Sequence, residues 1–325
     1  MIAEQRLKKI FCCVVVAGIA TVLIQINAQS VSTDKIIQTQ KTVNTLNLTE
    51  LTELKSTVAW RTEHLKKTCS ELEEKGAKFA LSDYVKERLL VDLEKKILFC
   101  PIPKAGSSNW KRIFAKLTTE NYDEVDDLLE IRKVHHIQLP VLSDFSLEKQ
   151  KRILDEFTKF VFVRHPFDRV LSAFRNKLEN PFTDEFQRRY GTKIVTKYRP
   201  YASDKSKKLG DDVSFTEFIH YLTEENPNKF NNHWQRYWDL CQPCSLQYDF
   251  IGTAENYQKE AELLVRTLNI TVTFPEHEAK TTAESSLEIF GSLSKAYLAK
   301  LYNIYKIDFA IFNYTIDHFI QLTKS

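Results

Sequence analysis

The chain has 325 residues, of which 43% are hydrophobic and 27% are charged. This apolar content is enough for a buried core, so the composition excludes a disordered chain. Lysine and arginine (46) exceed aspartate and glutamate (43) so slightly that the net charge is only +3, which excludes a protein whose overall charge attracts nucleic acid. A site for an anion must therefore be local.

An apolar segment lies close to the N-terminus. Residues 10–26 (IFCCVVVAGIATVLIQI) carry no charge and follow Arg6, Lys8 and Lys9. As a helix they cover most of the roughly 30 Å hydrocarbon core of a bilayer. Because basic residues precede the span, we predict a cytoplasmic tail at 1–9, a transmembrane signal anchor at 10–26 and a lumenal remainder, a type II membrane protein. The alternative is a signal peptide cleaved before Gln29, which gives a secreted protein.

Two features agree with a lumenal body. The triplets NLT, NIT and NYT predict N-glycosylation at Asn47, Asn269 and Asn313. Outside the apolar segment the chain has an even number of cysteines, which can form two disulfides in an oxidising lumen: Cys69, Cys100, Cys241 and Cys244. The sequence leaves their pairing open. Zinc is disfavoured because the first two lack the tight spacing of a knuckle, and we predict no metal site.

Residues 27–90 are assigned to a lumenal stem and 91–325 to a single folded domain. From 27 to about 66 the chain is rich in Thr, Gln, Asn and Ser, which indicates an extended segment. Residues 62–94 are charged and helix-prone, and the run LSDYVKERLLVDLEKK has apolar residues at helical spacing, so we expect a helix there. The alternative for this region is a solvated connector.

Three apolar runs in the folded domain predict strands, at 96–100 (KILFC), 159–163 (KFVFV) and 248–252 (YDFIG). A helical pattern follows each of them, and Pro166 suits the first turn of the second helix. Continuous apolar strands that alternate with helices are typical of an α/β domain, so we predict a mainly parallel central sheet flanked by helices.

The loops after the first two strands carry groups that hold anions. In an open α/β sheet, ligands bind beyond the carboxyl ends of the strands, where loop amides and helix N-termini converge. The first loop offers Lys104, Gly106 and two hydroxyls, and the second offers Arg164 with Ser172 two helical turns further on. The first is not a nucleoside triphosphate loop, because no glycine precedes Lys104 at the required spacing.

At these loops the sequence resembles a known family. IPKAGSSNWKRI is similar to the 5′-phosphosulfate loop, and FVFVRHPFDRVLSAFRNKL to the 3′-phosphate motif, of Golgi carbohydrate sulfotransferases that use the donor 3′-phosphoadenosine 5′-phosphosulfate (PAPS). The resemblance covers roughly residues 97–314 and is greatest to the chondroitin 4-O-sulfotransferase and HNK-1 sulfotransferase group. It departs at Ser107, where relatives commonly have cysteine (PKVACTNW), and this difference puts the family's disulfide arrangement in doubt.

The resemblance implies a P-loop-like sulfotransferase fold, PAPS as co-substrate, no required metal, and sulfuryl transfer to a glycan by the domain at 91–325. The residues that it places around the 5′ end of the donor are Pro103, Lys104, Ala105, Gly106, Ser107, Ser108 and Asn109. Those that it places around the 3′-phosphate are Arg164, His165, Pro166, Phe167, Asp168, Arg169, Val170, Leu171 and Ser172. Lys104 is also a catalytic candidate, because its charge can stabilise the departing phosphate oxygen.

The attacking hydroxyl also needs a base. His135 and His136 (KVHHIQL) lie between the two motifs, in the region from which related sulfotransferases draw their base, and a histidine pKa near neutrality suits the role. We favour His135, with His136, Glu and Asp residues, and His165 as alternatives.

Two further stretches allow both a binding and a plain structural interpretation. Residues 187–208 hold eight Lys or Arg, with Tyr190, Tyr198 and Tyr201 among them, so they form either a strip that binds an acidic glycan or a solvated face. We expect no nucleic-acid partner, because the body is lumenal. The CxxC at Cys241 and Cys244 is interpreted as structural, bridged either internally or to Cys69 and Cys100.

These observations favour a membrane-anchored Golgi enzyme that sulfates a glycosaminoglycan-type chain, with the 4-hydroxyl of GalNAc in chondroitin or dermatan as the first candidate. Alternatives are another acceptor, such as heparan or a terminal glucuronic acid of the HNK-1 type, and a non-catalytic lumenal glycan-binding protein on the same fold. The sequence indicates no oligomeric state.

Overall fold

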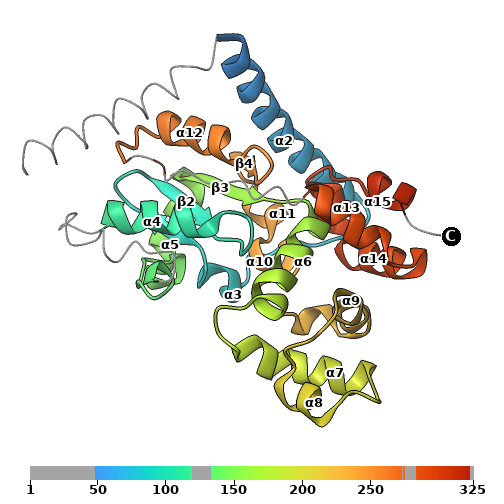
Figure 1. Cartoon of the computed structure of the whole chain (residues 1–325). Helices are drawn as coiled ribbons and strands as arrows, with labels where there is room; N and C mark the ends of the chain where they lie inside the picture. Colours follow the sequence, from blue (N-terminus) through green and yellow to red (C-terminus); the bar gives the residue numbers. More distant parts are fainter. Residues whose placement is uncertain (1–47, 119–132, 273, 275–282, 323–325) are drawn as a thin grey trace, which may run out of the picture. The chain divides into compact units, whose positions relative to one another are not determined.

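The structure is a computed structural model that describes residues 48–118, 133–272, 274 and 283–322. Among these, the residues from 55 onward cluster into one compact unit. Figure 1 shows the elements along the chain. They are α2 (Leu48–Glu74), α3 (Asp83–Lys86), β1 (Leu90–Asp92), β2 (Ile97–Cys100), α4 (Ser107–Thr118), α5 (Leu147–Glu156), β3 (Thr158–Val163), α6 (Pro166–Phe174), α7 (Thr192–Tyr198), α8 (Asp204–Leu209), α9 (Phe215–Glu224), α10 (Tyr237–Cys241), α11 (Pro243–Leu246), β4 (Phe250–Thr253), α12 (Tyr257–Thr267), α13 (Ala283–Gly291), α14 (Lys295–Ile311) and α15 (Asp317–Leu322).

The sheet has the order β1-β2-β3-β4. Strands β2, β3 and β4 are parallel, and β1 is antiparallel to β2. In the register Phe160 pairs with both Phe99 and Phe250, and the rings of Phe99 and Phe160 stack 4.7 Å apart. Trp110 of α4 packs on Phe160 at 4.6 Å. The predicted α/β class with a mainly parallel sheet is therefore confirmed, and all three predicted strands are present.

The prediction of a helix across residues 81–96 is wrong. Only the single turn of α3 forms there, and the chain then enters β1. Three consecutive apolar residues, Leu89, Leu90 and Val91, are all buried. A helix on a surface buries one stripe of residues, whereas an edge strand packed between layers can bury a continuous run. Leu90 pairs with Phe99, and the Val91 N–H donates to the Pro140 carbonyl at 2.9 Å.

The prediction of an extended stem is also wrong from residue 48 onward, because Leu48–Glu74 form the helix α2. Leu65 is fully buried and Cys69 is 3% exposed, so residues 55–90 of the expected stem belong to the compact unit. The anchor at 10–26 and Asn47 lie outside the described residues. Within the described part of the chain, no helix is long and apolar enough to cross a membrane.

A buried ion pair ties α2 to the sheet. Arg61 Nη1 donates to both carboxylate oxygens of Glu260 on α12 at 2.9 Å and to the Ile251 carbonyl of β4 at 3.1 Å. The Glu260 side chain is fully buried, and its carboxylate also accepts the Thr253 N–H at 2.6 Å. Burial raises the pKa of Glu260, with Arg61 opposing the rise. Arg61 is therefore the compensating charge for an acid in the core.

Replacing Arg61 by alanine is expected to lower the free energy of unfolding by about 3 kcal/mol or more, because it leaves Glu260 buried without its partner. Urea denaturation of the lumenal part measures the loss. The matched control is Lys67→Ala on the exposed face of the same helix, which should change the free energy by less than about 0.5 kcal/mol. Equal effects of the two changes would contradict a structural role for α2.

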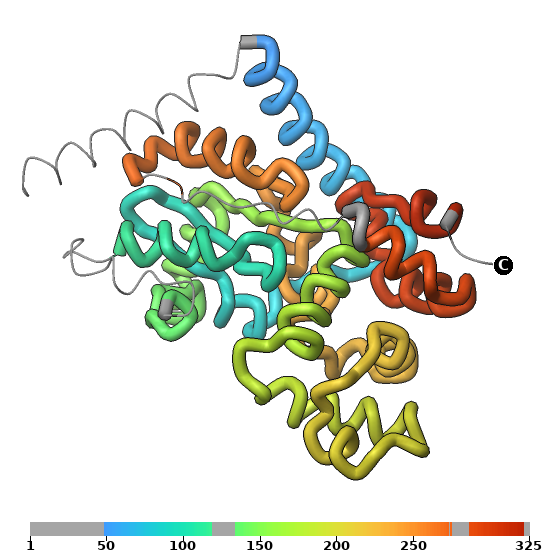
Figure 2. The backbone as a smooth tube through the Cα atoms, in the orientation of Figure 1, coloured from blue at the N-terminus to red at the C-terminus, as the bar shows by residue number. Residues whose placement is uncertain are grey.

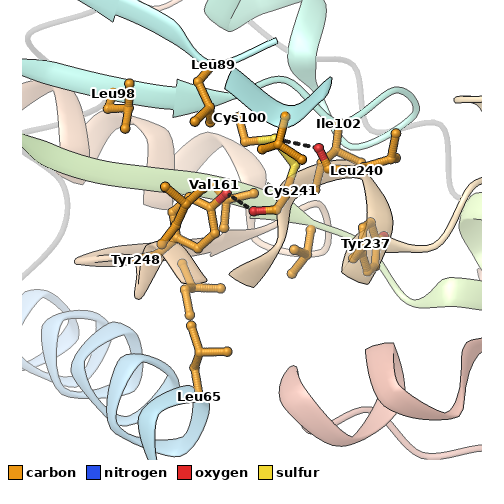
Figure 3. Packing of buried hydrophobic residues seen from close by; sticks show 14 of the residues in the cluster. Leu65, Leu89, Leu98, Cys100, Ile102, Val161, Tyr237, Leu240, Cys241 and Tyr248 are labelled. Carbon is orange, nitrogen blue, oxygen red and sulfur yellow. Dashed lines mark hydrogen bonds between the residues drawn. A yellow bond between two sulfur atoms is a disulfide. The ribbon is translucent and has the colours of Figure 1, made fainter. Parts of the chain in front are cut away.

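Both expected disulfides form, and both cross between distant segments. Cys69 of α2 pairs with Cys244, and Cys100 at the end of β2 pairs with Cys241, so the CxxC is not bridged internally. Figure 3 shows Cys100 and Cys241 among Leu98, Val161 and Tyr248, with the Tyr248 hydroxyl donating to the Cys241 carbonyl at 3.0 Å. The sequence separations of 175 and 141 mean that each bond removes a large loop from the unfolded chain.

A second cluster of buried residues lies among the helices that follow β3. Phe167 of α6, Phe218 of α9, Trp234 and Leu301 of α14 are all fully buried in it. Helix α7 packs on both α8 and α9, and α13 packs on α15 (Figure 2). This cluster fixes α6, whose first turn follows directly from the end of β3.

Candidate active site

The loop between β2 and α4 has a backbone that its sequence explains. Lys104 and Gly106 have φ values of +70° and +82°, in the region that glycine tolerates best. A Cβ on Gly106 would lie 2.1 Å from the ring of Tyr257, so only glycine fits. The Tyr257 hydroxyl donates to the Gly106 carbonyl at 2.5 Å. This fixes the loop at the N-terminus of α4, and the backbone amides of a helix N-terminus favour an anion.

The loop after β3 is fixed in a similar way. The Tyr237 hydroxyl accepts the Arg164 N–H at 3.1 Å and donates to the Arg164 carbonyl at 2.7 Å. Because β2 and β3 are parallel neighbours, Arg164 and the Lys104 loop leave the sheet at the same edge. The structure therefore brings the two predicted anion-binding loops together.

Several residues of the second motif have structural roles. His165 Nδ1 accepts the Phe167 N–H at 3.2 Å, so Nε2 carries the hydrogen that is donated to the Thr315 carbonyl at 2.9 Å. Burial lowers the pKa of His165. Asp168 accepts the Ser286 hydroxyl at 2.6 Å, and Phe167, Val170 and Leu171 lie in the core. Their side chains position the turn, which leaves Arg164 and half-buried Ser172 as the ligand candidates.

The resemblance placed Arg169 around the 3′-phosphate, but in the structure its side chain is a strut, a buried group that connects three segments of the chain. It is 1% exposed, and its guanidinium donates to three carbonyls: Pro103 at 3.0 Å, Gln235 at 2.7 Å and Asn232 at 2.9 Å. The guanidinium also lies over the Tyr237 ring, 4.8 Å from its centroid. One side chain thus joins the Lys104 loop, α6 and the segment before α10.

Replacing Arg169 by glutamine is expected to leave buried carbonyls unpaired and to lower the free energy of unfolding by about 3 kcal/mol, because hydrogen bonds from a charged donor are each worth roughly 1.5–3 kcal/mol. Chemical denaturation measures the change. The conservative Arg169→Lys keeps the charge but not the planar fork, so it should recover only part of the stability. A variant as stable as the wild type would contradict the strut.

His135 is the histidine that the structure places at the first loop. It ends a 3₁₀ turn (Lys133–His135) that packs on α4, and its Nε2 lies 3.1 Å from the Ser108 hydroxyl. More than a third of the residue is exposed, yet desolvation and the positive charges of Lys111 and Lys177 lower its pKa to about 4. The imidazole is therefore neutral near pH 6–7 and able to accept a proton. His136 is exposed and has no such contact with the loop in the described residues.

Two further residues lie at this site that are not among the predicted site residues. His233 follows the Asn231–Asn232 turn, and Lys177 lies in a π-helical turn after α6. Burial and the charges of Lys177 and Lys104 lower the pKa of His233 to about 3. Burial also lowers the pKa of Lys177. In the sequence, His233 is marked only by the string NNHW (231–234), which fits packed aromatic residues as well as a ligand site.

Most of the named side chains at 187–208 have partners within the fold. Arg199 pairs with Glu217 and Asp212, both at 2.6 Å, and Lys197 pairs with Glu224 at 2.8 Å. Tyr190 is buried, whereas Tyr201 is fully exposed. Much of this basic strip therefore joins α7 to α9 and to the turn that precedes α9, which agrees with a structural role. Asn269 and Asn313 are exposed, as a glycosylation site requires.

Comparisons with known proteins agree with this geometry. The profile of the sulfotransferase family matches residues 87–315. Carbohydrate sulfotransferase 11 of Rattus norvegicus is 33% identical over 246 residues, which cover 73% of this chain and 69% of the rat protein. Carbohydrate sulfotransferase 14 of Danio rerio is 36% identical over 238 residues (71% and 63%). Carbohydrate sulfotransferase 8 of Mus musculus is 31% identical over 261 residues (77% and 62%).

The chain belongs to the sulfotransferase family, and its relatives are carbohydrate sulfotransferases. The predicted family membership is thereby confirmed. No solved structure matches the chain. Among the described residues no group of acidic, histidine or cysteine side chains is arranged to hold a metal ion.

Proposed function

We propose that the protein is a PAPS-dependent carbohydrate sulfotransferase that acts on a glycosaminoglycan-type glycan. The observation that supports it most is the juxtaposition at one sheet edge of the Lys104 loop and Arg164, with His135 in contact with Ser108. The first candidate acceptor is the 4-hydroxyl of GalNAc in chondroitin or dermatan, which follows from the sequence resemblance to that group.

The residues present fit a nucleotide donor with phosphate at both ends. The Lys104 loop, closed by Tyr257 at the start of α4, suits the 5′ end, and Arg164 with Ser172 suits the 3′-phosphate. Lys104, Lys111 and Lys177 all depress the pKa of nearby histidines, so the site has a positive potential that favours an anion. When bound, PAPS supplies the sulfuryl group.

The chain's own groups then have distinct roles. The neutral ring of His135 takes the proton of the acceptor hydroxyl as its oxygen bonds to sulfur, and Lys104 stabilises the negative charge on the phosphate oxygen that leaves sulfur. Arg164 and Ser172 hold the end of the donor that does not react, which orients the transfer in line. Ser108 orients the His135 ring through their 3.1 Å contact.

We further propose that the protein is a type II Golgi membrane protein with its domain in the lumen, anchored by residues 10–26. Two disulfides between distant segments support an oxidising compartment. A secreted form, cleaved before Gln29, is the alternative, and neither form requires a nucleic-acid partner.

Incubation of the lumenal part with radiolabelled PAPS and a panel of desulfated glycans tests the proposal. Transfer to chondroitin or dermatan, with label on the GalNAc 4-hydroxyl, is the expected result. Transfer only to heparan or to a terminal glucuronic acid would correct the acceptor and keep the reaction. Glycan binding without transfer to any acceptor would overturn the enzyme in favour of a glycan-binding protein.

A further inference from the structure

His233 is held in one tautomer. Its Nδ1 lies 2.7 Å from the side-chain oxygen of Asn231, which can only accept, so Nδ1 carries the hydrogen. The same oxygen accepts the His233 N–H at 3.0 Å, and the Asn231 amide nitrogen donates to the Tyr190 hydroxyl at 3.3 Å, which fixes the orientation of the amide. In the neutral ring Nε2 is therefore an acceptor with an available lone pair, and within the described part of the chain it has no hydrogen-bond donor.

The ring is also fixed in space. It packs edge-to-face on Phe186, with ring centroids 5.2 Å apart, and Lys177 Nζ lies 4.7 Å from the Phe186 centroid. The residue is half-buried rather than enclosed. A core histidine normally satisfies both ring nitrogens, as His165 does with Phe167 and Thr315. His233 satisfies only one.

Arg169 connects this ring to the donor loop. Its guanidinium binds the carbonyls of Asn232 and Gln235 on either side of His233, and it also binds the Pro103 carbonyl next to Lys104. The position of His233 is thus set relative to Lys104 by a single buried side chain. The ring is close enough to Lys104, Lys177 and His135 for their charges to disfavour its protonation.

We propose that His233 is an acceptor-binding residue, whose neutral Nε2 accepts a hydrogen bond from a hydroxyl of the sugar that is sulfated. This inference rests on the proposed function. His135 stays the base because it contacts the donor loop through Ser108, whereas the ring of His233 packs on Phe186. The cations around His233 suit an acidic glycan. Because the ring itself stays neutral, its Nε2 can accept a hydrogen bond from the sugar hydroxyl and so orient it.

Two matched variants separate the ring nitrogens. In His233→Asn the amide can keep the contact with Asn231 but reaches no further, so the Nε2 acceptor is lost. In His233→Gln the amide oxygen can occupy the Nε2 position. The control is His220→Asn, at a histidine of α9 that pairs with Glu224. The measurements are kcat and KM for the acceptor found in the glycan panel, KM for PAPS, the dissociation constant of adenosine 3′,5′-bisphosphate, and the pH profile.

His233→Asn should lower kcat/KM for the acceptor at least about tenfold, while KM for PAPS and the affinity for adenosine 3′,5′-bisphosphate stay within about twofold. His233→Gln should recover much of the loss, and neither variant should move the acid limb of the pH profile. Unchanged acceptor kinetics in His233→Asn would overturn the inference, and so would an equal loss of bisphosphate affinity. Wild-type protein that transfers sulfate to no acceptor would overturn the proposed function and this inference with it. Circular dichroism and thermal unfolding show whether each variant is folded.

Discussion

Lys104→Ala is expected to lower kcat for sulfate transfer by about 10²-fold or more, with a smaller change in KM for PAPS. The charge of Lys104 acts where negative charge develops as the donor's bond breaks, and removing one such stabilising group typically costs about 10²–10³ in kcat. Arg164→Ala should behave differently, because a phosphate that does not react is bound equally in the ground and transition states. Its main effect should be a rise in KM for PAPS of about tenfold or more.

Steady-state kinetics with both substrates varied measure the two effects. Lys193→Ala is a control at an exposed lysine of α7 and should leave both parameters unchanged. Arg164→Lys keeps the charge but loses the planar fork, so it should recover only part of the donor affinity. Full turnover in Lys104→Ala would show that the loop after β2 does not hold the reacting end of the donor.

His135→Ala is expected to lower kcat by about 10²–10⁴-fold and to leave KM for PAPS nearly unchanged, because a general base acts on the acceptor hydroxyl. Pre-steady-state measurement of a single turnover isolates the chemical step. If His136→Ala alone produced this loss, the assignment of the base would be wrong. Ser108→Ala should cause a smaller loss, since it removes the contact that orients the ring.

The lowered pKa of His135 also sets the pH dependence. The base works as the neutral imidazole, so activity is present above its pKa and is lost as the pH falls through it. An ordinary histidine would give an acid limb near pH 6.5, whereas a pKa of about 4 predicts that kcat/KM for PAPS stays level down to about pH 5. Lys111→Gln removes one of the charges that depress the pKa, so it should move the limb toward higher pH. A wild-type limb near pH 6.5 would contradict the environment described for His135.

The sheet and its two loops could be predicted from the sequence because their signals are local. ILFC and FVFV are continuous apolar runs, and each is followed by a loop that carries a cation and then by the start of a helix. The region before residue 96 could not be predicted in the same way. Arg61 and Cys69 acquire their roles only from Glu260 and Cys244, which are 199 and 175 residues away, and a polar helix sequence gives no sign of such partners.

The site residues also differ in whether the sequence could identify them. Lys104, Gly106, Arg164 and Ser172 have their chemistry in their own loops, so the motif identified them. Arg169 was predicted to bind the 3′-phosphate because it lies within the motif. Its burial and its three carbonyl partners depend on the tertiary fold, which the motif does not show. His233 approaches the site only because that strut holds its segment there, and a single histidine between asparagine and tryptophan predicts no such position.

The central claim is that the loops after β2 and β3 hold the two ends of one nucleotide donor. A crystal structure of the lumenal part with adenosine 3′,5′-bisphosphate tests it most directly. The account predicts one nucleotide with its 5′-phosphate at Lys104 and the start of α4, and its 3′-phosphate at Arg164 and Ser172. A nucleotide bound elsewhere, or Lys104 and Arg164 too far apart to contact the same molecule, would contradict it.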